Sequence, residues 1–194
     1  MKIIVGLGNP GQTYHGTRHN VGFAVIQQLG DRHEVTLRQR LASRTDQRPA
    51  AVCGDYLLGA EPVRLMMPLT MMNESGDALR AVEVTPDQLL VVCDDVNLPL
   101  GTIRLRPSGG AGGHHGLASC LEALGTDSVP RLRVGVGTPE LPRDLEDFVL
   151  SQFSREERPV IRQAIEQAAD ACEAWIANGM AVTMNQYNRA QESE

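Results

Sequence analysis

The chain begins with residues 1–30, MKIIVGLGNPGQTYHGTRHNVGFAVIQQLG, in which a strand, a glycine-rich turn and a helix are predicted in succession. Residues 2–7 are rich in Ile and Val and alternate little, as a buried strand does. Residues 21–29 have helical spacing, and Gly30 is expected just past the end of that helix. This order of elements favours an α/β fold, in which helices pack on a sheet.

The remaining chain repeats the alternation of strands and helices. Further strands are predicted at residues 51–58, 63–67, 89–93, 102–106 and 132–136. Helices are predicted at residues 74–84, 117–124 and 154–179, the last starting with a capping box, Ser154 with Glu157. Because no repeat, linker or low-complexity segment interrupts this pattern, we expect a single α/β domain over residues 1–194, built on one twisted sheet.

The composition is that of a folded protein outside the membrane. Hydrophobic residues make up 42% and charged residues 22% of the chain, so a disordered chain is not expected. No apolar run approaches the roughly 20 residues of a membrane helix, and the N-terminus lacks a signal-peptide cleavage site. The four cysteines are scattered without a C-x-x-C pair, which speaks against a zinc site or a disulfide framework. We therefore expect a cytoplasmic protein.

Charge is distributed unevenly along the chain. The net charge is −6, yet residues 1–50 hold seven Lys/Arg against three Asp/Glu, and residues 140–194 hold five against eleven. Two groups of arginines stand out in the sequence: Arg38, Arg40, Arg44 and Arg48, and then Arg104, Arg106, Arg131 and Arg133. On charge alone these arginines only solvate a surface, but an acidic protein can still present a basic face to phosphates.

Residues 6–11, GLGNPG, match the G-x-G-x-x-G pattern of dinucleotide-binding loops. Two features oppose that function. Pro10 removes a backbone donor that would face phosphate, and no acidic residue closes a second strand about 20 positions on to bind ribose. The pattern instead predicts a tight turn that directs Asn9 into a cleft.

Polar residues follow several predicted strands, where α/β proteins place their sites. Asn9 follows the first strand, Asn73 follows another, and Asp94 follows the apolar residues 89–93. A histidine near a helix start or a carboxylate at a strand end is usually structural when taken alone. In combination, a carboxylate can fix the tautomer of His19, whose other ring nitrogen then takes a proton from water. Asparagine amides can donate to an oxyanion without adding charge.

No side chain offers itself as a nucleophile. The G-x-S-x-G elbow is absent. Cys93 adjoins Asp94, but on a strand its side chain points to the opposite face, so we predict a core cysteine. The adjacent His114 and His115 fit a shared metal poorly, and no H-E-x-x-H spacing occurs, so no metal site is predicted. Water is the simplest nucleophile.

Motifs along the whole chain resemble those of one family. In order, they are MKIIVGLGNPGQTYHGTRHNVGF, PLTMMNESGDAL, VVCDDVNLPLGTIRLR, GGAGGHHGL, RLRVGVG, FVLSQF and MNQYN. Together they closely resemble the bacterial peptidyl-tRNA hydrolase family. The resemblance implies a mixed β-sheet flanked by helices and a monomeric, metal-free esterase without a cofactor. Its implied partner is peptidyl-tRNA, from which it releases the peptide so that the tRNA is recycled, with no membrane and no obligate protein partner.

The resemblance also implies roles for individual residues. His19 matches the catalytic histidine, and Asp94 matches the aspartate that supports its basic form. Asn9 matches the asparagine that helps to separate N-blocked from free aminoacyl-tRNA. The implied binding residues are Asn73 near the scissile bond, Tyr14 at the acceptor end, and Arg106 and Arg133 along the tRNA backbone.

Two positions depart from the family pattern. Met71 stands where an aromatic residue is usual, so a flexible thioether replaces a stacking or packing contact. His115 stands where asparagine is usual, and an imidazole cannot copy an amide fully. We also expect residues 139–148, rich in charge and proline, to form a moving lid over the cleft. A non-enzymatic RNA-binding protein on the same scaffold, like relatives in organellar intron splicing, remains an alternative that fold alone does not separate.

Overall fold

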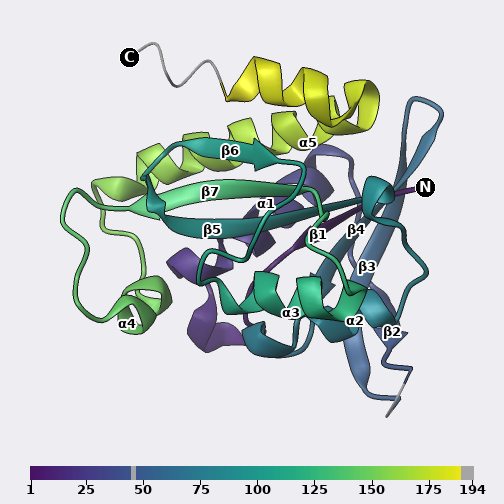
Figure 1. Cartoon of the computed structure of the whole chain (residues 1–194), viewed down its shortest axis with the longest axis horizontal. Helices are drawn as coiled ribbons and strands as arrows, with labels where there is room; N and C mark the ends of the chain where they lie inside the picture. Colours follow the sequence, from purple (N-terminus) through teal and green to yellow (C-terminus); the bar gives the residue numbers. More distant parts are fainter. Residues whose placement is uncertain (45–46, 189–194) are drawn as a thin grey trace.

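The computed structural model describes residues 1–44 and 47–188, and its centre is a seven-stranded sheet (Figure 1). The strand order is β2-β3-β4-β1-β5-β7-β6. The strands are β1 (Lys2–Gly6), β2 (Gln39–Ala42), β3 (Pro49–Leu58), β4 (Glu61–Pro68), β5 (Leu89–Pro99), β6 (Ile103–Arg106) and β7 (Arg131–Gly137).

The sheet is mixed, and the directions of its strands place several carboxyl ends at the same end of the sheet. β1 is parallel to β4 and to β5, and β5 is parallel to β7. The pairs β2–β3, β3–β4 and β6–β7 are antiparallel. The carboxyl ends of β4, β1, β5 and β7 therefore lie together at one end of the sheet, beyond which ligands bind in open α/β sheets. The predicted mixed α/β sheet is confirmed.

Helices cover both faces of the sheet (Figure 1). Side chains alternate across each strand, so Ile4 and Val92 face the cluster that holds α1 (Val21–Arg32) and α5 (Glu157–Tyr187). Val5 and Val91 face the other cluster, beneath α2 (Gly76–Arg80) and α3 (His115–Leu124). A short helix, α4 (Leu145–Leu150), lies beyond the end of β7 (Figure 1). None of the helices in the described part of the chain has the length and apolarity to cross a membrane.

Two glycines bring α1 directly onto the first strand. A Cβ atom at Gly6 would overlap the carbonyl oxygen of Gly22, and one at Gly22 would lie 2.5 Å from the Leu7 nitrogen. Only glycine permits this approach of backbone to backbone. The short 3-10 helix Arg18–Asn20, which leads into α1 and carries His19, is held close to the sheet as a result.

Several predicted boundaries are wrong. Gly30 lies inside α1, which runs to Arg32, because Gly30 admits the close carbonyl of Val35 and does not act as a left-handed cap. The strand predicted to end before Asp94 continues to Pro99, since β7 pairs with it at Asp94 and beyond. The helix predicted at 74–84 is reduced to the 3-10 turn Met72–Glu74 and the five-residue α2.

At the C-terminal side, the predicted capping box and the predicted helix end at Gly179 are both confirmed. The backbone N–H of Ser154 donates to Glu157 Oε2 at 2.7 Å, and the Glu157 N–H donates to Ser154 Oγ at 3.3 Å. The first helical segment of α5 ends at Gly179, whose φ of 76° and ψ of 172° are not helical, and a second segment continues to Tyr187. The edge strand β2 and the helix α4 are not predicted from the sequence pattern.

Candidate active site

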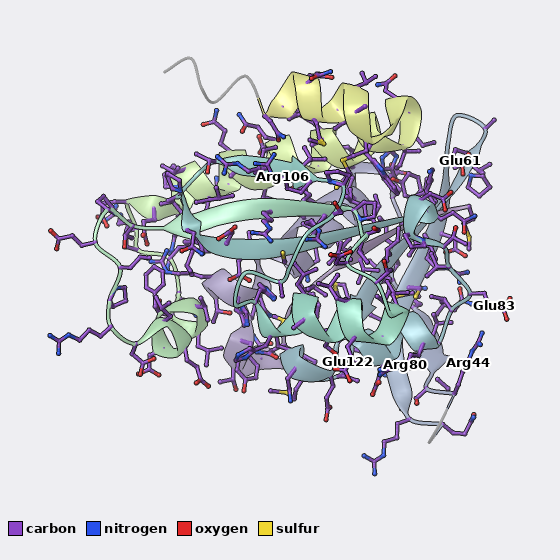
Figure 2. All side chains as sticks on the ribbon, in the orientation of Figure 1. Arg44, Glu61, Arg80, Glu83, Arg106 and Glu122 are labelled. Atoms are coloured by element: carbon purple, nitrogen blue, oxygen red, sulfur yellow. The ribbon has the colours of Figure 1, made fainter. Side chains whose placement is uncertain are left out.

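A cavity of about 850 Å³ opens at the end of the sheet where the carboxyl ends of the parallel strands lie. It is lined by eight of the nine predicted site residues: Asn9, Tyr14, His19, Met71, Asn73, Asp94, His115 and Arg133. The ninth, Arg106, is not in the lining and lies exposed on β6 (Figure 2). Residues that are up to 124 positions apart in sequence thus converge because their strands point the same way.

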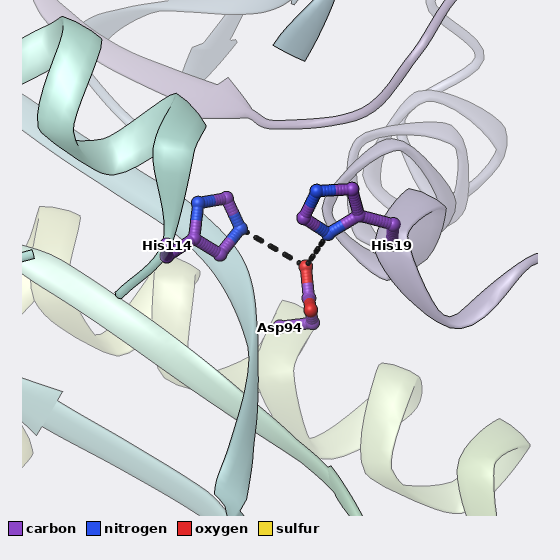
Figure 3. Close-up of side chains that lie close together, drawn as sticks. All are labelled: His19, Asp94 and His114. Atoms are coloured by element: carbon purple, nitrogen blue, oxygen red, sulfur yellow. Dashed lines mark hydrogen bonds and ion pairs between the residues drawn. The ribbon is translucent and has the colours of Figure 1, made fainter. Parts of the chain in front are cut away.

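Two histidines share one oxygen of a buried carboxylate (Figure 3). Asp94 is 4% exposed, and its Oδ1 lies 2.8 Å from His19 Nδ1 and 3.0 Å from His114 Nε2. The two rings lie with centroids 4.9 Å apart. Asp94 is thus the centre of a three-residue cluster, of which only two members were expected.

The hydrogen bonds determine the tautomers of both rings. Asp94 as a carboxylate only accepts, so both facing nitrogens carry protons. His114 Nδ1 accepts the backbone N–H of Leu117 at 3.1 Å, which is consistent with a proton on Nε2. For neutral His19, a proton on Nδ1 leaves the lone pair on Nε2, which points away from Asp94 (Figure 3). The cluster therefore presents one basic nitrogen, at the wall of the cavity.

Asp94 is kept ionised by its partners. Burial raises the pKa of this carboxyl group, but His114 and then His19 outweigh burial, through their positive charge when the rings are protonated and through their hydrogen bonds. The net result is a pKa well below its usual range. A carboxylate that stays charged both orients the imidazole of His19 and stabilises the imidazolium that forms when it takes a proton.

Asn9 is held so that its amide nitrogen is directed to the cavity. Asn20 Oδ1 accepts the Asn9 backbone N–H at 2.8 Å, and Asn20 Nδ2 donates to the Asn9 carbonyl at 2.9 Å. The Met72 backbone N–H donates to Asn9 Oδ1 at 2.7 Å. Because the amide oxygen is thus used, Asn9 Nδ2 is left without an acceptor among the described residues, at the cavity lining. Two N–H donors are available there for a ligand oxygen.

The cluster does not suit a metal ion. Among the described residues, His19, Asp94 and His114 are the one group of three whose ligand atoms lie within 4.8 Å of one another. A metal on His114 Nε2 would move the remaining ring proton to Nδ1. The Leu117 N–H already points at Nδ1, so two donors would face each other. The cluster therefore suits hydrogen bonds from the two histidine nitrogens to the Asp94 carboxylate rather than metal coordination.

The remaining predicted residues lie around the mouth of the cavity. Tyr14 is half-buried in the 3-10 helix Gln12–Tyr14, and Met71 is 43% exposed. Asn73 and His115 are exposed, the latter as the first residue of α3. Cys93 is in the core, where burial raises the pKa of its thiol above the ordinary range, as the prediction of a core cysteine requires. The positions of the mouth residues, Tyr14, Met71, Asn73 and His115, suit contacts with a ligand larger than the cavity itself.

The arginines predicted from the sequence have different roles in the fold. Arg131 is fully buried and donates to the carbonyls of Val129, Gly109 and Gly110, so it holds the glycine-rich loop. Arg133 donates to Asp95 Oδ2 at 3.0 Å and to the Gly110 carbonyl at 3.0 Å, and it is a lining residue that is already engaged. Arg40 and Arg106 lie on β2 and β6, the two opposite edges of the sheet. The two arginine groups in sequence are therefore not one basic surface.

Two parts of the site are not predicted from the sequence. His114 joins the cluster because the glycine-rich loop ends beside it, at the N-terminus of α3. Apart from its place after this loop, nothing in the sequence indicates that His114 contacts Asp94. The second part is α4, which contributes Leu145, Glu146, Val149 and Leu150 to the cavity lining. Its signal is Asp144, whose side chain accepts the Asp147 N–H and caps the helix. The expected lid, residues 139–148, therefore ends in a helix that forms a wall of the cavity.

Comparison with known proteins shows the family of this chain. A model of the family described as peptidyl-tRNA hydrolase matches residues 3–194. A peptidyl-tRNA hydrolase of Syntrophomonas wolfei subsp. wolfei is 44% identical over 192 residues, which cover 97% of this chain and 100% of the relative. One of Alkaliphilus oremlandii is 41% identical with the same coverage. The crystal structure of peptidyl-tRNA hydrolase from Acinetobacter baumannii has a TM-score of 0.86 and 32% identity, covering 97% of this chain and 94% of that chain. The chain belongs to the peptidyl-tRNA hydrolase family.

Proposed function

We propose that the protein hydrolyses the ester bond between tRNA and a peptide or N-blocked aminoacyl group. The family membership supports the reaction, and one observation supports its chemistry. His19 Nδ1 is bound to Asp94 at 2.8 Å, which leaves Nε2 as a base at the cavity wall. In this role the protein is a cytoplasmic, single-domain monomer that returns tRNA to translation.

The proposed reaction uses water as the nucleophile. His19 Nε2 takes a proton from water as the oxygen attacks the ester carbon, and Asp94 balances the imidazolium that results. Asn9 Nδ2 is available to donate to the oxygen on which negative charge develops. Collapse of the intermediate breaks the bond to the ribose oxygen, which receives the proton from His19. The ester needs a weaker nucleophile than an amide would, since its leaving group is better.

The rim residues are proposed to hold the two parts of the substrate. Tyr14, Asn73 and His115 surround the mouth where the acceptor end enters, and Met71 offers an exposed apolar contact. Arg133 lies in the lining beside Asp95, and Arg106 lies farther out on β6. Together they extend the contact surface from the scissile bond toward the tRNA backbone, where phosphate contacts position a nucleic acid.

The test is release of an N-acetylated amino acid from its tRNA, with free aminoacyl-tRNA as the comparison. We expect rapid release from the first and little from the second. Tight RNA binding without cleavage of either would support the RNA-binding alternative instead. Thermal stabilisation by NAD would support the dinucleotide alternative, and none is expected.

Asn9→Asp is expected to lower kcat by about 10²–10³-fold while the fold is kept, in line with the loss of one oxyanion donor. The aspartate still accepts the Met72 N–H but places a negative oxygen where Nδ2 donates. Single-turnover hydrolysis and circular dichroism measure the two effects. The matched control is Asn97→Asp, an exposed asparagine of β5 that lines the same cavity without holding a loop, and it is expected to lose less than tenfold. Equal losses in both variants would remove Asn9 from the mechanism.

Arg106→Gln is expected to weaken tRNA binding and to reduce the slope of log affinity against log salt by about one. The reason is that one exposed cation on β6 would no longer displace a counterion from a phosphate. Arg80→Gln changes the net charge equally on the other side of the molecule, where Arg80 pairs with Asp77 at 2.6 Å (Figure 2). Titration of labelled tRNA at several salt concentrations distinguishes the two. An unchanged slope for Arg106→Gln would exclude it from the tRNA surface.

A further inference from the structure

Arg18, the residue before the proposed base, is buried in a set of contacts that the reaction does not use. Its side chain is 7% exposed and its guanidinium holds Glu157 at 2.7 Å and 3.0 Å, one distance to each carboxylate oxygen. Burial raises the pKa of Glu157, but the contacts with Arg18 and the Ser154 N–H lower it by more than burial raises it. The pKa is therefore below its ordinary value, and the pair is charged. Glu157 also caps α5 through Ser154, so Arg18 is joined to the start of that helix.

The same guanidinium lies between two aromatic rings. Its central carbon is 4.5 Å from the centroid of Phe148 and 4.8 Å from that of Phe153. Phe148 belongs to α4, and Phe153 lies in the segment that joins α4 to α5. Arginine suits this position better than lysine, because its flat guanidinium stacks on rings while Nη2 donates to both oxygens of Glu157 and Nε donates to Ser151.

Two further hydrogen bonds join Arg18 to Ser151, the residue that follows α4. The Arg18 backbone N–H donates to the Ser151 carbonyl at 3.0 Å, and Arg18 Nε donates to Ser151 Oγ at 3.3 Å. Ser151 Oγ in turn donates to the Phe148 carbonyl at 2.6 Å, which closes the last turn of the helix. Arg18 therefore joins the segment that carries His19 to helix α4, and both line the same cavity.

We propose that Arg18 is a positioning residue that fixes α4 against the His19 segment and so sets the width of the substrate cleft. The proposal rests on the proposed hydrolysis only for its effect on the substrate. Phe148 and Arg18 themselves do not line the cavity, whereas their neighbours His19, Val149 and Leu150 do. Substitutions that weaken the contact between Arg18 and α4 should therefore lower the affinity for the substrate while the His19–Asp94 hydrogen bond is kept.

The experiment compares Arg18→Lys and Phe148→Leu with the control Arg32→Lys. Arg32 also pairs with two carboxylates, Asp170 at 2.7 Å and Glu173 at 3.1 Å, but it joins α1 to α5 outside the cavity. Two readouts are used for all variants and the wild type, well below their melting temperatures: hydrogen exchange of residues 145–150, and kcat and KM for N-acetylaminoacyl-tRNA. Phe148→Leu keeps the buried ion pair, so it tests the contact even where Arg18→Lys does not fold.

The expected result is exchange of α4 at least about tenfold faster in both test variants, because local opening replaces a fixed contact. KM should rise about tenfold with kcat within about threefold, the pattern of lost binding without lost chemistry. Arg32→Lys should change neither. A lower melting temperature with wild-type exchange and KM would overturn the proposal, and so would a fall in kcat at constant KM. Should the wild type leave peptidyl-tRNA intact, the proposed function fails, and the exchange measurement still decides whether Arg18 holds α4.

Discussion

His19→Ala is expected to lower kcat for a peptidyl-tRNA substrate by at least about 10²–10⁴-fold, the usual contribution of a general base. The variant removes the nitrogen that takes the proton from water. The fold should be kept because Asp94 Oδ1 retains His114 as a partner at 3.0 Å, so no buried charge is left unpaired. Binding of tRNA should also be kept, since the rim residues are unchanged. Single-turnover hydrolysis and a tRNA titration measure the two quantities separately.

His15→Ala is the matched control for this prediction. His15 is an exposed histidine in the loop before the 3-10 helix Arg18–Asn20, and its side chain has no hydrogen bond among the described residues. Its removal should leave kcat within about threefold of the wild type, as is usual for surface substitutions. Near-normal hydrolysis by His19→Ala would remove His19 as the base, whatever the control does.

Asp94→Asn is expected to lower kcat by an amount comparable with His19→Ala, about 10²–10⁴-fold. The amide is uncharged, so it no longer stabilises the imidazolium that forms in the reaction. Its NH₂ group can also turn toward His19, which would move the proton to Nε2 and remove the base. The pKa of Asp94 lies well below the usual range, so the wild-type group is charged throughout the neutral range and the substitution removes a full charge.

Asp95→Asn controls for the loss of a carboxylate at the neighbouring position. Asp95 pairs with Arg133 at 3.0 Å and touches neither histidine of the cluster, so a loss below tenfold is expected. The double variant of His19→Ala and Asp94→Asn should be about as slow as the slower single variant, because residues that act as a unit are not additive. Additive losses would show that Asp94 acts independently of His19.

Much of the fold could be predicted from local patterns. The central strand β1 and the first half of β5 are buried on both faces, so residues 2–7 and 89–93 are apolar without interruption and are recognised easily. The errors fall where a neighbour decides. The end of β5 depends on pairing with β7 at Asp94 and Asp95, and the length of α1 depends on the contact between Gly30 and Val35. Short elements such as β2 and α4 have too few residues for a period to emerge.

The site was predictable in composition and not in arrangement. Asn9 and Asn73 could be selected because they follow parallel strands, Asp94 because it follows an apolar run, and the motifs matched a family. Whether Arg131 binds phosphate or holds a loop could not be decided from its sequence neighbours. Its burial against the carbonyls of Val129, Gly109 and Gly110 is a property of the packed sheet.

The sequence by itself determined the mixed α/β class, the family and the residues that meet at one end of the sheet, because hydrophobic period and motif order are local properties of the chain. Only the tertiary structure decided that His114 joins Asp94, that α4 lines the cavity and that Arg18 joins this helix to the His19 segment. These contacts join residues 20 to 133 positions apart. Hydrogen bonds and ring contacts at such separations depend on where packing brings the elements, and no local pattern in the chain specifies that placement.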